Sequence, residues 1–221
     1  MIIAIDGPAG SGKSSTAKLV AAALKIVHLD TGAMYRAITL KCLTLHIPVA
    51  NEAAIGAMME NTEITFTGTV PDIRTWLDGT DVTNAIRTAD VTAHVSDYCA
   101  VPVVREKLVM LQRQIGQSTS VVCEGRDIGT VVFPNADLKF YMDASIEERA
   151  RRRQKDFERM GVVKSIEELV ADIAQRDTKD STRQNSPLRK ADDAEFVDTT
   201  GMTLQQQADY VVNKARKLHR T

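Results

Sequence analysis

The residues from Gly7 to Ser14 have the types and the spacing that bind phosphate groups. They read Gly-Pro-Ala-Gly-Ser-Gly-Lys-Ser, which fits the pattern G-x-x-x-x-G-K-[ST]. The glycines let backbone N–H groups curl around a phosphate, Lys13 can reach the β- and γ-phosphates, and the Ser14 hydroxyl can bind Mg²⁺. The motif therefore predicts a nucleoside triphosphate site. Its members are Gly7, Pro8, Ala9, Gly10, Ser11, Gly12, Lys13, Ser14 and Ser15.

Two further segments concentrate charged side chains where a second ligand could bind. Residues 124–130 join acidic and basic side chains to two glycines directly after an apolar run, although a charged turn with a local Arg–Asp pair would look the same. Arg176, Asp180 and Arg183 follow at i, i+4 and i+7 and share one face if the helix continues. Between Arg149 and Lys190 lie 12 of the 28 Lys and Arg residues, which favours phosphate contact over a merely solvated face.

Hydrophobic periodicity predicts the elements that must position these residues. Short apolar runs read as buried parallel strands at 1–5, 26–29, 120–123, 138–142 and 195–197. Helical patterns lie at 15–24, 33–46 and 88–99, and further helices open at Pro102, Ser145, Ser165 and Thr203. Asp30-Thr31-Gly32 follows the second strand, where ligands often sit in open α/β sheets. Segments 63–67, 74–77 and 80–83, with the turn Asp78-Gly79, predict a small antiparallel insert.

Two helices carry specific expectations about their charged residues. In the helix that opens at Pro102, Val104, Leu108, Leu111 and Ile115 form the apolar stripe, and Arg105 is expected to project from a different side. The stretch Arg149 to Arg153 is too densely charged to be fully buried. We expect its arginines to repel one another and to stay open until nucleotides bind.

Length and composition bound the class of protein. The 221 residues suffice for one core with a small insert, and the formal net charge of −1 gives no general attraction for nucleic acid or an anionic membrane. No stretch has the length of a membrane span, and because a core strand is expected at the start, we expect no signal peptide. The three cysteines are widely spaced, without a metal-ligand pattern, and fit a reducing cytosol. A cytoplasmic protein is expected.

Four segments together resemble the bacterial cytidylate kinases, which phosphorylate CMP and dCMP. They are the phosphate loop, Asp-Thr-Gly-Ala-Met-Tyr-Arg at 30–36, Glu-Gly-Arg-Asp-Ile-Gly-Thr at 124–130, and Arg-Asp-Thr-Lys-Asp-Ser-Thr-Arg at 176–183. The phosphate loop is generic, whereas the other three in this order are specific to the family. The resemblance covers nearly the whole chain, including the insert and Asp-Thr-Thr at 198–200.

The resemblance implies an α/β fold, a phosphate-loop kinase core with a five-stranded parallel sheet flanked by helices. It further implies a monophosphate-binding insert with a small antiparallel sheet, and a mobile lid. The chain would be one kinase unit over 1–221, with the core at 1–32, 101–144 and 184–221, the monophosphate-binding subdomain at about 33–100 and the lid at about 145–183.

The resemblance also implies roles for site residues. CMP would be surrounded by Thr31, Arg36, Ser96, Arg105, Arg126, Asp127, Arg176, Asp180 and Arg183. Ser96, Arg126 and Asp127 would read the cytosine edge, Arg36, Arg105 and Arg176 would hold the phosphate, and Asp180 and Thr31 would lie at the sugar. The catalytic residues would be Lys13, Arg126, Arg176 and Arg183, and the lid arginines Arg149, Arg152 and Arg153. The family commonly has serine where Thr31 stands, so its sugar preference is open here.

The expected reaction is transfer of the γ-phosphoryl group of ATP to CMP or dCMP, giving CDP or dCDP and ADP, in pyrimidine nucleotide metabolism. Mg²⁺ would accompany ATP, with Ser14 as its protein ligand. The expected partners are these nucleotides, without nucleic acid or membrane, and a monomer is expected. Two alternatives are another small-molecule kinase with UMP or AMP as acceptor and a nucleotide-dependent switch, which would not need the arginine clusters at 126 and 176–183.

Overall fold

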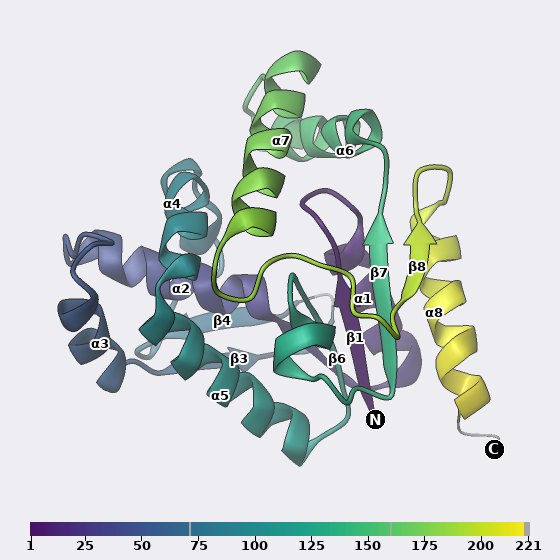
Figure 1. Cartoon of the computed structure of the whole chain (residues 1–221), viewed down its shortest axis with the longest axis horizontal. Coiled ribbons are helices and arrows are strands. Elements are labelled where there is room, and N and C mark those ends of the chain that lie inside the picture. Colours follow the sequence, from purple (N-terminus) through teal and green to yellow (C-terminus); the bar gives the residue numbers. More distant parts are fainter. Residues whose placement is uncertain (71, 160, 219–221) are drawn as a thin grey trace. The chain divides into compact units, whose positions relative to one another are not determined.

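A five-stranded parallel sheet forms the centre of the first of two compact units (Figure 1). The structure is a computed structural model that describes residues 1–70, 72–159 and 161–218. The first unit comprises Met1–His28 with Ser120–Thr221, and the second Leu29–Thr119. The sheet order is β2-β6-β1-β7-β8, and β2 continues from the first unit into the second. Its strands are β1 Ile2–Asp6, β2 Val27–Asp30, β6 Val121–Gly125, β7 Leu138–Asp143 and β8 Glu195–Asp198.

The central strand β1 pairs in parallel with β6 on one side and β7 on the other. Ile3 lies opposite Val122 in one pairing and Leu138 in the other. Ile3, Ala4 and Ile5 are fully buried because both faces of the strand are covered, which explains the uninterrupted apolar run in the sequence. The carboxyl end of β1 is Asp6, and the phosphate loop follows directly.

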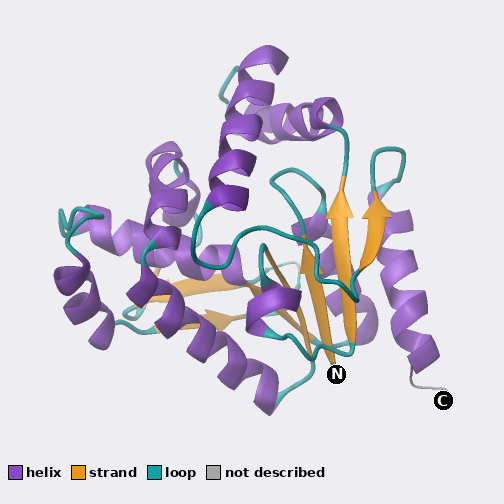
Figure 2. Ribbon diagram, in the orientation of Figure 1, coloured by secondary structure: helices purple, strands orange, loops and turns teal. Residues whose placement is uncertain are grey.

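The helices that accompany this sheet in the first unit can be followed in Figure 2. They are α1 Lys13–Leu24, α6 Ile146–Arg159, α7 Ile166–Thr182 and α8 Leu204–Leu218. Helices α1 and α8 pack together, and α6 packs on α7 through Ala150, Leu169 and Ile173. The predicted capping box of Ser165 and Glu168 is present at the start of α7, so the sequence signal for this helix is confirmed.

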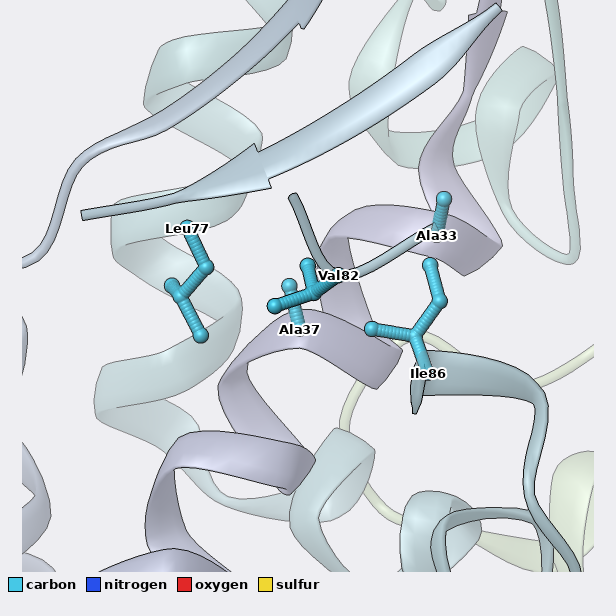
Figure 3. Close-up of a cluster of buried hydrophobic side chains, with 5 residues drawn as sticks. All are labelled: Ala33, Ala37, Leu77, Val82 and Ile86. Atoms are coloured by element: carbon cyan, nitrogen blue, oxygen red, sulfur yellow. The ribbon is translucent and has the colours of Figure 1, made fainter. Parts of the chain in front are cut away.

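The second unit contains helices packed on a small antiparallel sheet. Asp78 and Gly79 both have positive φ between β4 and β5, so the predicted Asp-Gly hairpin is confirmed. In a buried cluster Leu77, Val82 and Ile86 face Ala33 and Ala37 of α2 (Figure 3). The elements are α2 Thr31–Thr44, α3 Glu52–Glu60, β3 Ile64–Thr67, β4 Arg74–Leu77, β5 Thr80–Asp81, the short 3₁₀ helix η1 Ala85–Arg87, α4 Ala89–Ala100 and α5 Pro102–Ser118.

The expected fold class is therefore confirmed, and the boundaries of most elements shift by one to three residues from those expected. Helix α1 begins at Lys13, two residues earlier than predicted, because the phosphate loop leads into the helix without an intervening turn. No helix in the described residues is both long and apolar enough to cross a membrane.

Candidate active site

The phosphate loop connects the end of β1 to the start of α1, and its glycines are sterically required. Gly7 has φ +151°, and a Cβ there would lie 2.0 Å from the carbonyl oxygen of Met142. Gly12 has φ +91° at the N-cap of α1, and a Cβ there would lie 2.6 Å from the Oε1 atom of Gln207. Any side chain at these two positions would displace neighbouring groups, so the loop can follow this path only with glycine.

Lys13 is the first residue of α1, and its side chain is held inside the first unit. It is 6% exposed, and its Nζ donates to the carbonyl oxygen of Pro8 at 3.0 Å. Burial lowers the pKa of Lys13 to about 7, and the positive charge of Arg126 acts in the same direction while Glu124 opposes both. A bound phosphate would supply negative charge beside the ammonium group and raise this pKa again.

Arg126 follows β6 and pairs with Asp180 near the end of α7. The Nε of Arg126 donates to the Oδ2 of Asp180 at 2.8 Å, and both side chains are largely buried. Burial alone would raise the pKa of Asp180, but the charges of Arg126 and Arg176 outweigh it and the pKa lies below its usual range. Three of the predicted CMP residues therefore share one electrostatic cluster, and Arg126 and Arg176 also lower the pKa of Lys13.

Asp127 and Arg183 extend the same cluster. The Nη2 of Arg183 lies 3.7 Å from the Oδ1 of Asp127, and both side chains are buried. Asp127 precedes a single turn of π-helix, η2 Ile128–Val132, in which the N–H of Val132 donates to the carbonyl oxygen of Asp127 at 3.1 Å. Such turns occur frequently at functional sites. The segment 124–130, expected only as a charged turn or a ligand contact, thus carries its own defined backbone geometry.

Asp6 belongs to this region and was not among the residues predicted from the sequence. Its Oδ1 accepts the N–H of Ile128 and its Oδ2 accepts the N–H of Gly129, each at 2.7 Å. The side chain is buried, and burial raises the pKa of Asp6 to about 6 although both N–H bonds pull it down. A charged residue at the end of an otherwise apolar strand was the one signal in the sequence that could have drawn attention to it.

Residues from the end of the first unit brace the phosphate loop. The hydroxyl of Thr199, after β8, donates to the carbonyl oxygen of Ser11 at 2.9 Å. On α8, Gln207 accepts the hydroxyl proton of Thr16 at 2.8 Å and is itself buried. The sequence predicted the apolar face of α8, but it gave no sign that this polar side chain points at α1.

The three predicted lid arginines lie on α6 in different surroundings. Arg149 is 7% exposed and contacts the carbonyl oxygen of Ala9 at 3.3 Å and the carboxylate of Asp177 on α7. Arg152 is half-buried and pairs with Glu148, and Arg153 lies over the ring of Phe157. The expectation of an exposed, mutually repelling group is therefore wrong for Arg149, because carbonyl and carboxylate oxygens compensate its charge.

The second unit holds the other four predicted CMP residues. Thr31 is buried at the start of α2, and Ser96 is half-buried on α4. On α2, the Nη1 of Arg36 donates to the hydroxyl of Thr92 at 2.8 Å. The guanidinium carbon of Arg105, on α5, lies 5.3 Å from the centre of the Tyr35 ring. Arg105 is only 5% exposed, so the side of α5 from which it projects is also covered, which the apolar stripe alone did not predict.

The residues present fit Mg²⁺ only as a companion of the nucleotide phosphates. The described ranges contain no group of three or more His, Cys, Asp and Glu side chains that could hold a metal ion. Ser14 is exposed at the second position of α1, at the positive end of that helix. A hydroxyl in this position can complete the oxygen shell of an ion whose other ligands are phosphate oxygens and water.

The chain is similar in sequence to proteins described as cytidylate kinases. A profile of the family described as cytidylate kinase matches residues 3–217. The cytidylate kinase of Clostridioides difficile is 45% identical over 214 residues and 97% of each chain. That of Geobacter sulfurreducens is 43% identical over 220 residues, which is 100% of this chain and 94% of the relative.

Other relatives are longer than this chain. The bifunctional pantoate ligase/cytidylate kinase of a Synechococcus strain is 49% identical over 220 residues, 98% of this chain. The chain spans 40 to 41% of the length of the bifunctional relatives that it matches. Among solved structures, an uncharacterized protein from Eubacterium ventriosum has a similar fold, with a TM-score of 0.54, 12% identity and coverage of 98% of both chains.

Proposed function

The chain belongs to the cytidylate kinase family, and from this we propose that it transfers the γ-phosphoryl group of ATP to CMP or dCMP. The products would be ADP and CDP or dCDP. The observation that carries the proposal is the position of Lys13 within the charged cluster of Arg126, Arg176 and Asp180. A nucleotide-dependent switch needs the phosphate loop but has no use for further arginines around its lysine.

The acceptor chemistry requires positioning and charge neutralisation. The phosphate of a nucleoside monophosphate has a second pKa of about 6, so at neutral pH it is largely a dianion and needs no general base. Lys13 would face the β- and γ-phosphates of ATP, and Arg126, Arg176 and Arg183 would offset negative charge on the acceptor and the transferring group. Asp180 already holds Arg126, and Asp127 lies beside Arg183, so these two side chains need little reorganisation when the phosphates arrive.

The base and the sugar would be read by a small set of polar groups. Asp127 can accept a hydrogen bond from the cytosine amino group, whereas uracil presents a carbonyl there and would face another acceptor. For Asp180 and Thr31 we propose the sugar, and for Arg36 and Arg105 the CMP phosphate, with Ser96 at the base. These roles rest on the family resemblance of the segments that contain them.

Mg²⁺ would be held by the phosphates of ATP and the Ser14 hydroxyl, and when bound it would neutralise part of the phosphate charge. The protein's own contribution is to fix the phosphate chain by backbone N–H groups of the loop from Gly7 to Gly12 and by the N-terminus of α1. The arginines of α6 would exclude water from the transferring group and limit hydrolysis of ATP.

The test is ADP release measured with CMP, dCMP, UMP and AMP as acceptors, with Lys13→Met as the inactive reference. We expect CMP and dCMP to give the highest kcat/KM and Lys13→Met to lose at least about a thousandfold in turnover while staying folded. The matched control is Lys18→Met on the same helix, which should keep near-normal turnover. A higher kcat/KM for UMP or AMP would assign the alternative acceptor, and no acceptor-dependent ADP release would favour the switch.

A further inference from the structure

We propose that Asp6 is a positioning residue that holds the base-reading segment, Arg126 and Asp127, in register with the phosphate loop. The names of the two substrates rest on the proposed function, but the mechanical link between the two loops does not. Asp6 is the last residue of β1 and precedes Gly7, while Asp127 precedes Ile128, where the carboxylate of Asp6 binds. One short side chain therefore joins the backbone of the proposed donor site to the backbone of the proposed acceptor site.

The carboxylate of Asp6 and the N–H groups of Ile128 and Gly129 form a two-point contact, called the clasp below. Each carboxylate oxygen of Asp6 accepts a different N–H group, from Ile128 and from Gly129, and both distances are 2.7 Å. These N–H groups are consecutive at the start of the π-helical turn η2. Two bonds to successive donors fix both the distance and the orientation of the segment, which one bond would not do.

Gly129, which donates one of the two hydrogen bonds, also allows a close approach to Asp6. A Cβ at Gly129 would lie 3.3 Å from the Oδ2 of Asp6 and 3.2 Å from the Cδ of Lys139, closer than most real Cβ contacts. Glycine at this position therefore lets the N–H group come within hydrogen-bond distance of the carboxylate without steric overlap with Asp6 or Lys139. Both ends of the contact, a short acid and a residue without a side chain, match a close approach.

The cost of this arrangement argues against a merely structural role. The Asp6 side chain is 4% exposed, and burying a carboxylate disfavours its charged form, as the raised pKa of this group reflects. The charged groups that act on it are Asp127, which disfavours its ionised form, and Lys13, which favours that form. A buried carboxylate is costly to keep in a strand that is otherwise apolar, and strongly perturbed groups of this kind concentrate at functional sites.

The experiment compares Asp6→Asn and Asp6→Ala with a matched control on the same strand. At the other end of β1, the N–H of Ile2 donates to the Oδ2 of Asp137 at 2.6 Å, which is also a carboxylate bound to a backbone donor. Asp137→Asn removes that charge far along the strand from the phosphate loop. The measurements are kcat, KM for CMP, the affinity for ATP alone, and amide hydrogen exchange at Ile128 and Gly129.

A positioning role predicts a specific division of effects. We expect kcat/KM for CMP to fall about tenfold or more in Asp6→Asn and about a hundredfold in Asp6→Ala, because asparagine keeps one acceptor oxygen. Affinity for ATP alone should stay within about threefold, since the loop donates its own N–H groups to the phosphates. Exchange at Ile128 and Gly129 should accelerate in both variants, and Asp137→Asn should leave every one of these quantities near the wild-type value.

Other outcomes would overturn the proposal. Unchanged exchange at Ile128 and Gly129 in a folded Asp6 variant would show that the clasp does not hold this segment. Equal losses in ATP affinity and in CMP kinetics would mean that Asp6 serves the whole fold. If the Asp6 variants do not fold, Gly129→Ala perturbs the clasp from its other side without removing a charge, and normal CMP kinetics with normal exchange in that variant would count against it.

The same measurements distinguish failure of the proposed kinase function from failure of the Asp6 proposal. In that case the wild-type protein would release no ADP in response to CMP, while the hydrogen-exchange comparison would still report on the clasp. The exchange data therefore decide whether Asp6 holds the segment, and the kinetic data decide whether the segment acts on CMP.

Discussion

The guanidinium of Arg126 and the carboxylate of Asp180 are joined at 2.8 Å, with little of either side chain exposed to solvent. This pair ties the residue that follows β6 to the last turns of α7. Removing one partner leaves the other as a buried charge without its main compensation. The stability of the first unit therefore depends on residues that we also place at the acceptor.

We expect Asp180→Asn to lower the free energy of unfolding by about 3 kcal/mol, as is typical when one member of a buried pair is removed. The pKa of Asp180 is depressed in the folded protein, so its contribution is present above the ordinary aspartate pKa of about 4. The contribution is lost as the pH falls through the lower folded value, so wild type and variant should converge in acid. Urea unfolding at several pH values measures this difference.

The control for this prediction lies on the same helix. Asp172 forms an exposed pair with Lys164 at 2.7 Å, so Asp172→Asn should cost less than about 1 kcal/mol. Equal losses of unfolding free energy in Asp180→Asn and Asp172→Asn would show that the buried Arg126–Asp180 pair stabilises the protein no more than an exposed pair does.

Binding of ATP should be coupled to proton uptake by Lys13. Burial places the pKa of this lysine at about 7 in the free protein, so at pH 7.5 part of the population is neutral. Phosphate charge favours the ammonium form and raises the pKa, so each binding event should take up a fraction of a proton. Calorimetry of ATP binding in buffers with different ionisation enthalpies measures this number.

The proton uptake should depend on pH and on the side chain at position 13. Uptake should diminish as the pH falls towards 6, because Lys13 is then already charged before ATP binds. Lys13→Arg and Lys13→Met have no group at this position that titrates between pH 6 and 8. Both variants should therefore take up fewer protons than wild type when ATP binds. Equal uptake by wild type and variants would assign the proton to another group.

Asp127→Ala should weaken the use of CMP much more than the use of UMP. In the proposed complex the carboxylate would accept a hydrogen bond from an amino group that uracil lacks, so its loss would remove a contact for one base and relieve repulsion for the other. We expect a loss of about tenfold or more in kcat/KM for CMP and a smaller one for UMP. Equal losses would show that Asp127 acts through its contact with Arg183 and does not read the base.

The predicted lid should become ordered only when both substrates are present. Arg149 contacts both the phosphate loop at Ala9 and α7 at Asp177, so added phosphate charge would act directly on the link between them. Amide exchange across 149–159 and 161–183 should slow with a two-substrate analogue and much less with ATP or CMP alone. Affinity for the analogue should fall as the salt concentration rises. Unchanged exchange with the analogue would remove the lid from the mechanism.

Local sequence patterns predicted the parts of this protein that depend on neighbours in the chain. The phosphate loop, the hairpin at Asp78-Gly79 and the capping box at Ser165 each follow from residues within a few positions of one another. The spacing of Arg176, Asp180 and Arg183 predicted a shared face if the helix continued. Helix α7 contains Arg176 and Asp180 but ends at Thr182, so Arg183 lies just beyond it as the C-cap residue.

Contacts between distant residues could not be predicted in this way. Asp6 binds N–H groups that are 122 and 123 residues further along the chain, and no local pattern announces such a partner. Arg105 was expected to project from a different side of α5 than the apolar stripe, and its neighbours on the helix gave no sign of its burial. The ring of Tyr35 on α2 explains that burial. Arg149 is buried for the same kind of reason, since its partners come from the phosphate loop and α7.

The bracing of the phosphate loop by Thr199 and Gln207 has a consequence for biosynthesis. The loop is translated before its partners, because the residues that bond to Ser11 and Thr16 follow 188 and 191 positions later in the chain. The second unit, in contrast, is one continuous stretch, Leu29–Thr119, and its internal contacts are complete long before that point. Domains of a nascent chain generally fold as units in order of synthesis. The second unit can therefore fold before the segment from β8 to α8, which contains the residues that support the phosphate loop, has been translated. We therefore expect a growing chain to acquire its full affinity for ATP only after Thr199 and Gln207 have been translated.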